Sequence, residues 1–129
     1  MMNIIPKNKS DIEAVSNLDN LSNKELEPYL VELLTWVQDI NWPVAGYIAP
    51  RLSQAGIEII EPIKQILKSD DATWKYWIIS QILPFSNKQV QDSMKSMLIE
   101  IINNPTASDH HDEVDLVAKE LIESMQNET

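Results

Sequence analysis

The fold is decided by residues 26–56, which read LEPYLVELLTWVQDINWPVAGYIAPRLSQAG. Apolar side chains recur there at spacings of three and four, which places them on one face of a helix. The first stripe consists of Leu26, Leu30, Leu33, Leu34 and Val37, and the second of Val44, Ile48, Leu52 and Ala55. Between them lies Asn41-Trp42-Pro43, with Pro43 expected in the first turn of the second helix and Gly56 at its C-cap. This stretch predicts a helical hairpin.

The same pattern extends along the chain in both directions. A short leading helix is expected from Asp11 to Leu18, capped by Ser10. Four further stripes follow, and Pro62, Pro84 and the Asn103-Asn104-Pro105 string mark helix boundaries among them. They contain Ile59, Ile63, Ile66 and Leu67; Trp74, Trp77, Ile78 and Ile82; Val90, Met94, Met97, Leu98, Ile101 and Ile102; and Val114, Val117, Leu121 and Met125.

Short turns between successive helices require antiparallel neighbours, so the helices group into hairpins at 23–56, 57–84 and 86–126. We therefore predict a single domain over residues 1–129 of the all-α class. Its expected architecture is a short α-α superhelix of about three stacked, HEAT-like hairpins with a short leading helix. A compact bundle of the same helices is the alternative.

Composition excludes several classes of function. No cysteine is present, which removes disulfides, thiolate nucleophiles and cysteine-based metal sites. Two glycines are too few for a phosphate-binding loop. The net charge is −10, from 20 acidic and 10 basic residues, and this argues against nucleic-acid binding, which needs a basic face. An acidic excess of this size favours basic partners, although more often it serves only to keep a small protein soluble.

No apolar run approaches the length of a membrane span, and residues 1–10 lack the apolar core of a signal peptide. We therefore expect a cytoplasmic location without membrane contact.

Several strings together resemble a small bacterial family known only as domain of unknown function 5071. They are Ile5-Pro6-Lys7 with Asp11, Leu33 to Asp39 running into Asn41-Trp42-Pro43-Val44, Asp70-Asp71-Ala72-Thr73-Trp74-Lys75-Tyr76-Trp77, Pro105-Thr106 and Glu113-Val114-Asp115. The resemblance covers nearly the whole chain. It implies an all-α, HEAT-like domain and supplies no catalytic residue.

The turns inside the three predicted hairpins are rich in carboxylates and contain two tryptophans. If the hairpins stack in register, these turns form an acidic edge that could bind a partner protein. The candidate residues are Asp39, Asn41 and Trp42 in the first turn, Asp70, Asp71, Trp74 and Lys75 in the second, and Asp109, Asp112 and Glu113 in the third.

Each of these features also has a structural interpretation. Carboxylates at a helix start cap the helix, and Asp71 can pair with Lys75 four residues later. Tryptophans at helical spacing are usually part of the core, which applies to Trp36, Trp74 and Trp77. Trp42, which lies in a turn, is the best candidate for an interface.

The two histidines, His110 and His111, lie among acidic residues. In a continuous helix His110 would meet Glu113 and His111 would meet Asp115, which gives each pair two potential metal ligands. A catalytic site needs three ligands that converge in a pocket. We therefore predict a solvated acidic helix start, with no metal, no other cofactor and no catalytic residue.

Three functions remain. The preferred hypothesis is a non-enzymatic interaction module that binds a basic protein. Neutralisation of that protein, in the manner of an immunity protein, is one role that this hypothesis includes. The second is a HEAT-like glycosylase using Trp74 and Trp77 with Asp71 or Asp39, which the net charge disfavours. The third is an acidic mimic of nucleic acid.

Overall fold

The structure is a computed structural model that describes residues 4–127, and this part of the chain is built from helices without any β-strand. No helix within it is long and apolar enough to cross a membrane. The α-helices are α1 (Ile12–Val15), α2 (Asn23–Leu26), α3 (Leu30–Thr35), α4 (Ala45–Leu52), α5 (Ile60–Leu67), α6 (Ala72–Gln81), α7 (Lys88–Asn103), α8 (Ala107–His111) and α9 (Val114–Gln126). Short 3-10 helices are η1 (Leu18–Asn20), η2 (Glu27–Tyr29), η3 (Ile57–Ile59) and η4 (Leu83–Phe85).

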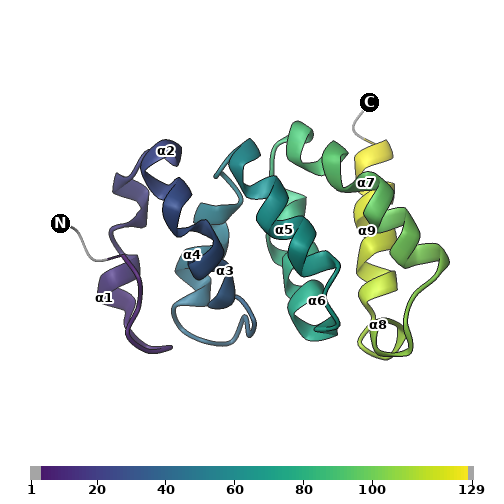
Figure 1. Cartoon of the computed structure of the whole chain (residues 1–129), viewed down its shortest axis with the longest axis horizontal. Helices are drawn as coiled ribbons and strands as arrows, with labels where there is room; N and C mark the ends of the chain where they lie inside the picture. The colour runs from purple at the N-terminus through teal and green to yellow at the C-terminus, as the bar shows by residue number, and fades with distance from the viewer. Residues whose placement is uncertain (1–3, 128–129) are drawn as a thin grey trace.

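The helices stand side by side in an elongated row, with the two ends of the chain at opposite ends of the row (Figure 1). Helix α3 packs on α4, α5 on α6, and α7 on α9, while α9 also contacts α6. The prediction of an all-α helical array is confirmed.

The predicted stripes form the core. Residues at helical spacing are fully buried in each hairpin and join one continuous cluster. Examples are Leu33, Ile48, Ile63, Ile78, Leu98 and Val114. Burying apolar side chains of this size stabilises the fold by about 1.5–3 kcal/mol each relative to leaving them in water.

Polar contacts join each hairpin to the next. The indole nitrogen of Trp74 donates a hydrogen bond to the carbonyl of Leu34 (3.1 Å), and the hydroxyl of Ser53 donates to the carbonyl of Ile82 (3.2 Å). These contacts tie the first hairpin to the second. The second is tied to the third by an ion pair between Lys75 on α6 and Asp109 on α8.

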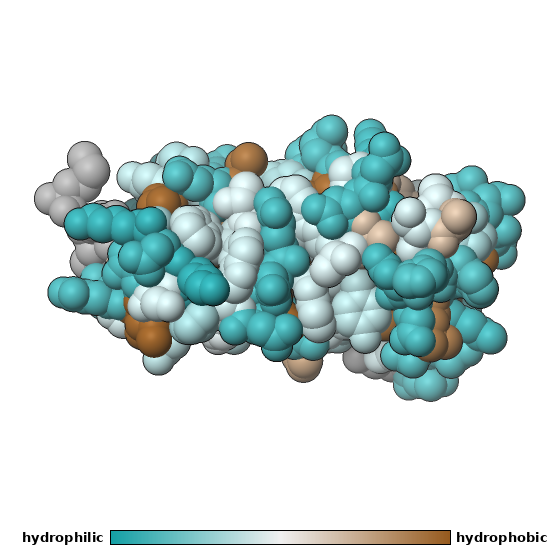
Figure 2. All heavy atoms as spheres, turned by 90° about the horizontal axis from the view of Figure 1, so that it is seen from below, coloured by the Kyte–Doolittle hydropathy of each residue, from teal (hydrophilic) through white to brown (hydrophobic). Residues whose placement is uncertain are grey.

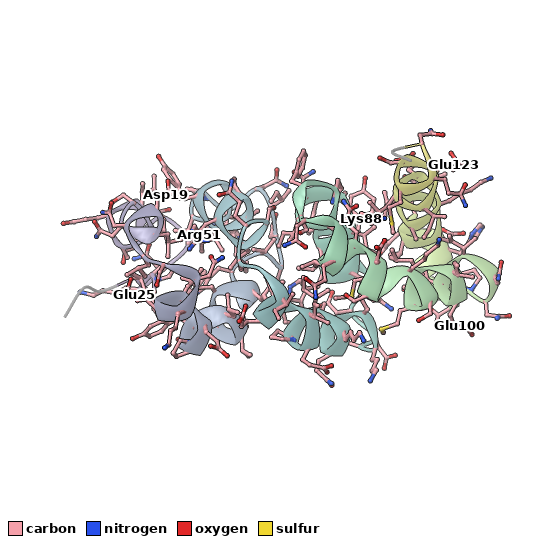
Figure 3. All side chains as sticks on the ribbon, turned by 90° about the horizontal axis from the view of Figure 1, so that it is seen from above. Asp19, Glu25, Arg51, Lys88, Glu100 and Glu123 are labelled. Carbon is pink, nitrogen blue, oxygen red and sulfur yellow. The ribbon has the colours of Figure 1, made fainter. Side chains whose placement is uncertain are left out.

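Arg51 fixes α4 to the N-terminal segment. Its side chain is buried, with Nε donating to the carbonyl of Leu18 (3.2 Å) and Nη2 to the carbonyl of Leu21 (2.9 Å). Figure 3 looks onto the edge of the array opposite the α3–α4 loop and labels Arg51 near Asp19 and Glu25. The guanidinium of Arg51 therefore holds the segment around η1 against α4.

The helix predicted from the first apolar stripe, Leu26 to Val37, is shorter and less regular than the stripe suggests. Pro28 lies in η2, because proline cannot donate the backbone hydrogen bond that a continuous α-helix would need there. Helix α4 begins only at Ala45, so the prediction that Pro43 lies in its first turn is wrong. Residues 36–44 instead form a loop of turns.

Two predicted caps also differ. Asp11, and not Ser10, caps α1, since its carboxylate accepts from the backbone N–H of Ala14. Gly56 lies beyond the end of α4, where Ser53 is the C-cap, and precedes η3. Its φ of 83° is a conformation that only glycine adopts at little cost, so glycine is needed there as a linker between the first two hairpins.

The last predicted helix is divided in two at Glu113, which has a φ of 65° and a left-handed conformation. This residue ends the α8 segment and redirects the chain into α9. The interruption changes which side chains meet at the start of α9.

Candidate functional site

The three acidic turns lie along one edge of the array, at the bottom of Figure 1: the loop between α3 and α4, the turn between α5 and α6, and α8 with its junction to α9. We call this the turn edge, defined by residues 36–44, 68–74 and 107–113. Figure 2 looks onto it from below and shows a largely hydrophilic surface with a paler band of residues of intermediate hydropathy across its middle.

In the first turn, Asp39 is half-buried and its carboxylate accepts from the backbone N–H of Asn41 (2.9 Å). Asn41 is exposed. Trp42 is half-buried and packs edge-on against Trp36, with ring centroids 5.9 Å apart. This geometry fixes the loop and leaves part of the Trp42 ring accessible.

In the second turn, Asp70 and Asp71 are both exposed. Asp71 caps α6 by accepting from the backbone N–H of Trp74 (3.0 Å), so its structural role as a cap is established. Asp70 has no such contact. Trp74 is half-buried, held by its hydrogen bond to the Leu34 carbonyl.

Lys75 and Asp109 do not belong to the exposed edge. Nζ of Lys75 lies 2.7 Å from Oδ1 of Asp109, and each side chain is 4% exposed. The prediction that they contact a partner is wrong, and so is the predicted pairing of Lys75 with Asp71. The helix turns Lys75 inward, where the nearest carboxylate belongs to the next hairpin.

In the third turn, Asp112 is half-buried and Glu113 exposed. The hydroxyl of Thr73 donates to Oδ2 of Asp112 (3.5 Å), a contact that joins the second turn to the third. Thr73 and Asp112, together with Trp77 and Glu113, line a hollow of about 260 Å³ between α6 and the α8–α9 junction.

The histidines pair differently from the prediction, because the helix is interrupted at Glu113 and the continuous helix assumed for the predicted pairs does not form. His110 Nδ1 lies 2.8 Å from Oδ2 of Asp115, and His111 Nδ1 lies 3.0 Å from Oδ1 of Asp112. Hydrogen bonding and charge from Asp115 raise the pKa of His110, while the bond from His110 lowers the pKa of Asp115. Within residues 4–127, no group of three or more His, Cys, Asp or Glu side chains is arranged to hold a metal ion.

A family model described as domain of unknown function (DUF5071) matches residues 4–122. The chain belongs to this family. The match confirms the resemblance predicted from the Asp-Asp-x-x-Trp-Lys-Tyr-Trp string and its companions, and the DUF5071 model covers every candidate residue of the turn edge. None of the curated proteins compared with the chain matches it.

Two residues of this DUF5071 domain that bear on the site were not predicted from the sequence. Val31 is 67% exposed although it lies within the first apolar stretch, and Thr73 bridges two turns. For Val31 the signal is its position on the helix: with 3.6 residues per turn, Leu30, Leu33 and Leu34 share one face, and Val31 lies about 100° away from the centre of that face. Thr73 offers no comparable signal.

Proposed function

We propose that this DUF5071 domain is a non-enzymatic interaction module that binds a protein with a basic surface through the turn edge. A HEAT-like manner of binding, with an extended surface offered by successive hairpins, is part of the proposal. Neutralisation of the basic partner, as by an immunity protein, is one physiological outcome that the proposal includes.

The observation that carries the proposal is that three carboxylates on the turn edge have no ion pair with a lysine or arginine of the described residues. Asp39, Asp70 and Glu113 come from three separate turns, and no lysine or arginine of residues 4–127 forms an ion pair with any of them. Among the carboxylates of the turn edge, Asp71 is the one whose position is explained by helix capping. A row of carboxylates without internal counter-ions raises the rate and specificity of association with a positively charged surface.

The aromatic residues support the same function. Trp42 and Trp74 are both half-buried, and each is held by a specific contact, to Trp36 and to the Leu34 carbonyl respectively. Rigid, partly exposed tryptophans are enriched among the residues that contribute most to protein interfaces.

The glycosylase alternative has weaker support. Its proposed residues do not converge, because Trp74 and Trp77 line different hollows and Asp71 is engaged as a helix cap. The net charge of −10 also opposes binding to a phosphate backbone. We further propose a cytoplasmic location, in keeping with a chain that contains no cysteine.

The test compares three immobilised proteins: the wild type, the edge variant Asp39→Asn/Asp70→Asn/Glu113→Gln, and the control variant Glu27→Gln/Glu120→Gln/Glu123→Gln. Both variants lose three negative charges, and all of the substituted control residues are exposed. Asn at position 39 retains an oxygen that can accept from the backbone, so the first turn is preserved.

Proteins captured from native lysate are identified by mass spectrometry, and their affinities are then measured with purified material at two salt concentrations. We expect a basic protein to be retained by the wild type and the control but released by the edge variant. Equal retention by all three proteins would show that the turn edge is not the binding surface.

A further inference from the structure

An open apolar hollow lies between α3 and α5, next to the turn edge. Its volume is about 220 Å³, and its walls come from three helices: Val31 and Leu34 from α3, Pro62 and Ile66 from α5, and Trp74 from α6. We call it the α3–α5 hollow. The hollow lies between the first hairpin and the second, where the indole nitrogen of Trp74 donates its hydrogen bond to the Leu34 carbonyl.

The hollow keeps an apolar surface in contact with water. Val31 at its rim is 67% exposed, and Trp74 is only half-buried. A bound partner could cover both side chains. Leaving such surface uncovered forgoes about 25 cal/mol for each Å² that a partner could bury. The hollow is therefore suited to receive one apolar side chain.

Exposed carboxylates neighbour the lining residues of the hollow along the chain. The turn that connects the lining residues Ser69 and Trp74 contains Asp70 and Asp71, both exposed. Glu32 follows Val31 and Glu61 precedes Pro62, and both are exposed as well. Against these four acidic residues stand two lysines, Lys64 within α5 and Lys68 at its C-cap, so the neighbouring positions carry a net negative charge.

These charges select among possible occupants. A second copy of this chain carries the same net charge of −10 and is disfavoured by repulsion. The volume is below the roughly 300–1,000 Å³ typical of sites for small organic ligands. A protein segment with an apolar side chain next to a lysine or arginine matches both features. The apolar side chain fits the hollow, and the basic side chain is attracted by the acidic residues beside it.

We propose that the α3–α5 hollow is the anchor site of the interaction module and receives a single aliphatic or aromatic side chain from a partner segment, flanked by basic residues that face Asp70 and Asp71. This inference rests on the proposed function and adds the specificity determinant to it. The turn edge attracts basic surfaces in general, and the hollow distinguishes among them.

The test uses a display library of random twelve-residue peptides selected on the wild-type protein, followed by affinity measurements on three variants. Val31→Asp places a charge in the hollow, and Phe85→Asp places the same charge at another exposed apolar residue, which is 69% exposed and outside the hollow. The third is the edge variant Asp39→Asn/Asp70→Asn/Glu113→Gln. Unfolding curves confirm that all variants fold.

The design separates packing from charge, because Val31→Asp makes the protein more acidic. Simple attraction between opposite charges would strengthen binding of a basic peptide to this variant. Loss of an anchor contact would weaken it at least about tenfold, which corresponds to about 1.4 kcal/mol, a cost that only a minority of interface residues reach.

We expect selected peptides to pair an aliphatic or aromatic residue with Lys or Arg, to lose at least tenfold in affinity on Val31→Asp, and to bind Phe85→Asp as they bind the wild type. Basic peptides without an apolar preference, bound equally by Val31→Asp, would overturn the anchor site and leave the proposed function intact. Peptides that bind both the edge variant and Val31→Asp as tightly as the wild type would overturn both.

Discussion

Lys75 Nζ and Asp109 Oδ1 lie 2.7 Å apart in the interior of the protein, and each side chain is 4% exposed. The pair connects α6 to α8 and therefore the second hairpin to the third. A buried ion pair contributes little net stability compared with apolar residues of the same size, but loss of one partner leaves an uncompensated charge. The two residues thus act as one structural unit.

We predict that Lys75→Met destabilises the protein by about 3–5 kcal/mol, because it leaves the Asp109 carboxylate buried without a counter-charge. The double variant Lys75→Met/Asp109→Leu should recover most of this loss. Urea unfolding followed by circular dichroism measures both. A double variant as unstable as the single one would show that the cost comes from packing and not from the unpaired charge.

The two glycines should respond to alanine in opposite directions. Gly56→Ala forces a side chain into a conformation with φ of 83° and should destabilise the protein by about 1–3 kcal/mol. Gly46 lies within α4, and an added Cβ there meets no atom within 4 Å, so Gly46→Ala should stabilise by about 0.5–1 kcal/mol. Midpoints of thermal and urea unfolding give the signs, and two shifts in the same direction would contradict this account.

Arg51→Lys should destabilise the protein by about 1–3 kcal/mol, because a lysine cannot reproduce the two hydrogen bonds from Nε and Nη2 to the carbonyls of Leu18 and Leu21. Unfolding by urea provides the measurement. Lys119→Gln, at an exposed position, serves as the control and should change stability by less than about 0.5 kcal/mol. Equal effects of the two substitutions would mean that the guanidinium contacts do not hold the N-terminal segment.

The pair formed by His110 and Asp115 predicts a pH dependence. The raised pKa of His110 means that its contribution to stability is complete below about pH 6.5 and is lost as the pH rises through the folded-state pKa. The lowered pKa of Asp115 means that its contribution is present above about pH 3.9 and is lost as the pH falls through the folded-state pKa. The pair therefore acts mainly between about pH 4 and 6.5.

NMR titration of the His110 ring tests this directly. Asp115→Asn should lower the pKa of His110, because the carboxylate that accepts its hydrogen bond is removed. An unchanged titration curve in this variant would show that the two side chains do not interact in solution.

The periodic stripes made the helices predictable, because burial on one side of a helix imposes a spacing that is visible in the sequence itself. Leu33, Ile63 and Leu98 were placed in the core for this reason and lie there. The approximate helix boundaries followed from prolines and capping residues, with errors where Pro28 and Pro43 change the backbone.

Contacts between hairpins, and the break between α8 and α9, could not be predicted from the sequence in the same way. A local rule assigned Lys75 to Asp71, but the folded chain offers Asp109, and the buried contact prevails over the local one. Glu113 adopts a left-handed conformation for which glutamate has no preference, so the division between α8 and α9 could not be inferred. The pairing of both histidines changed as a consequence.

The hydrogen bond from Trp74 ends on the main chain of Leu34, and the same is true of the bond from Ser53 to Ile82. A carbonyl is present whichever residue occupies the position, so only the donor side chain is constrained by identity. Apolar substitutions of similar size at positions 34 and 82 should therefore preserve both bonds, whereas loss of the Trp74 or Ser53 side chain removes the donor and loosens the alignment of adjacent hairpins.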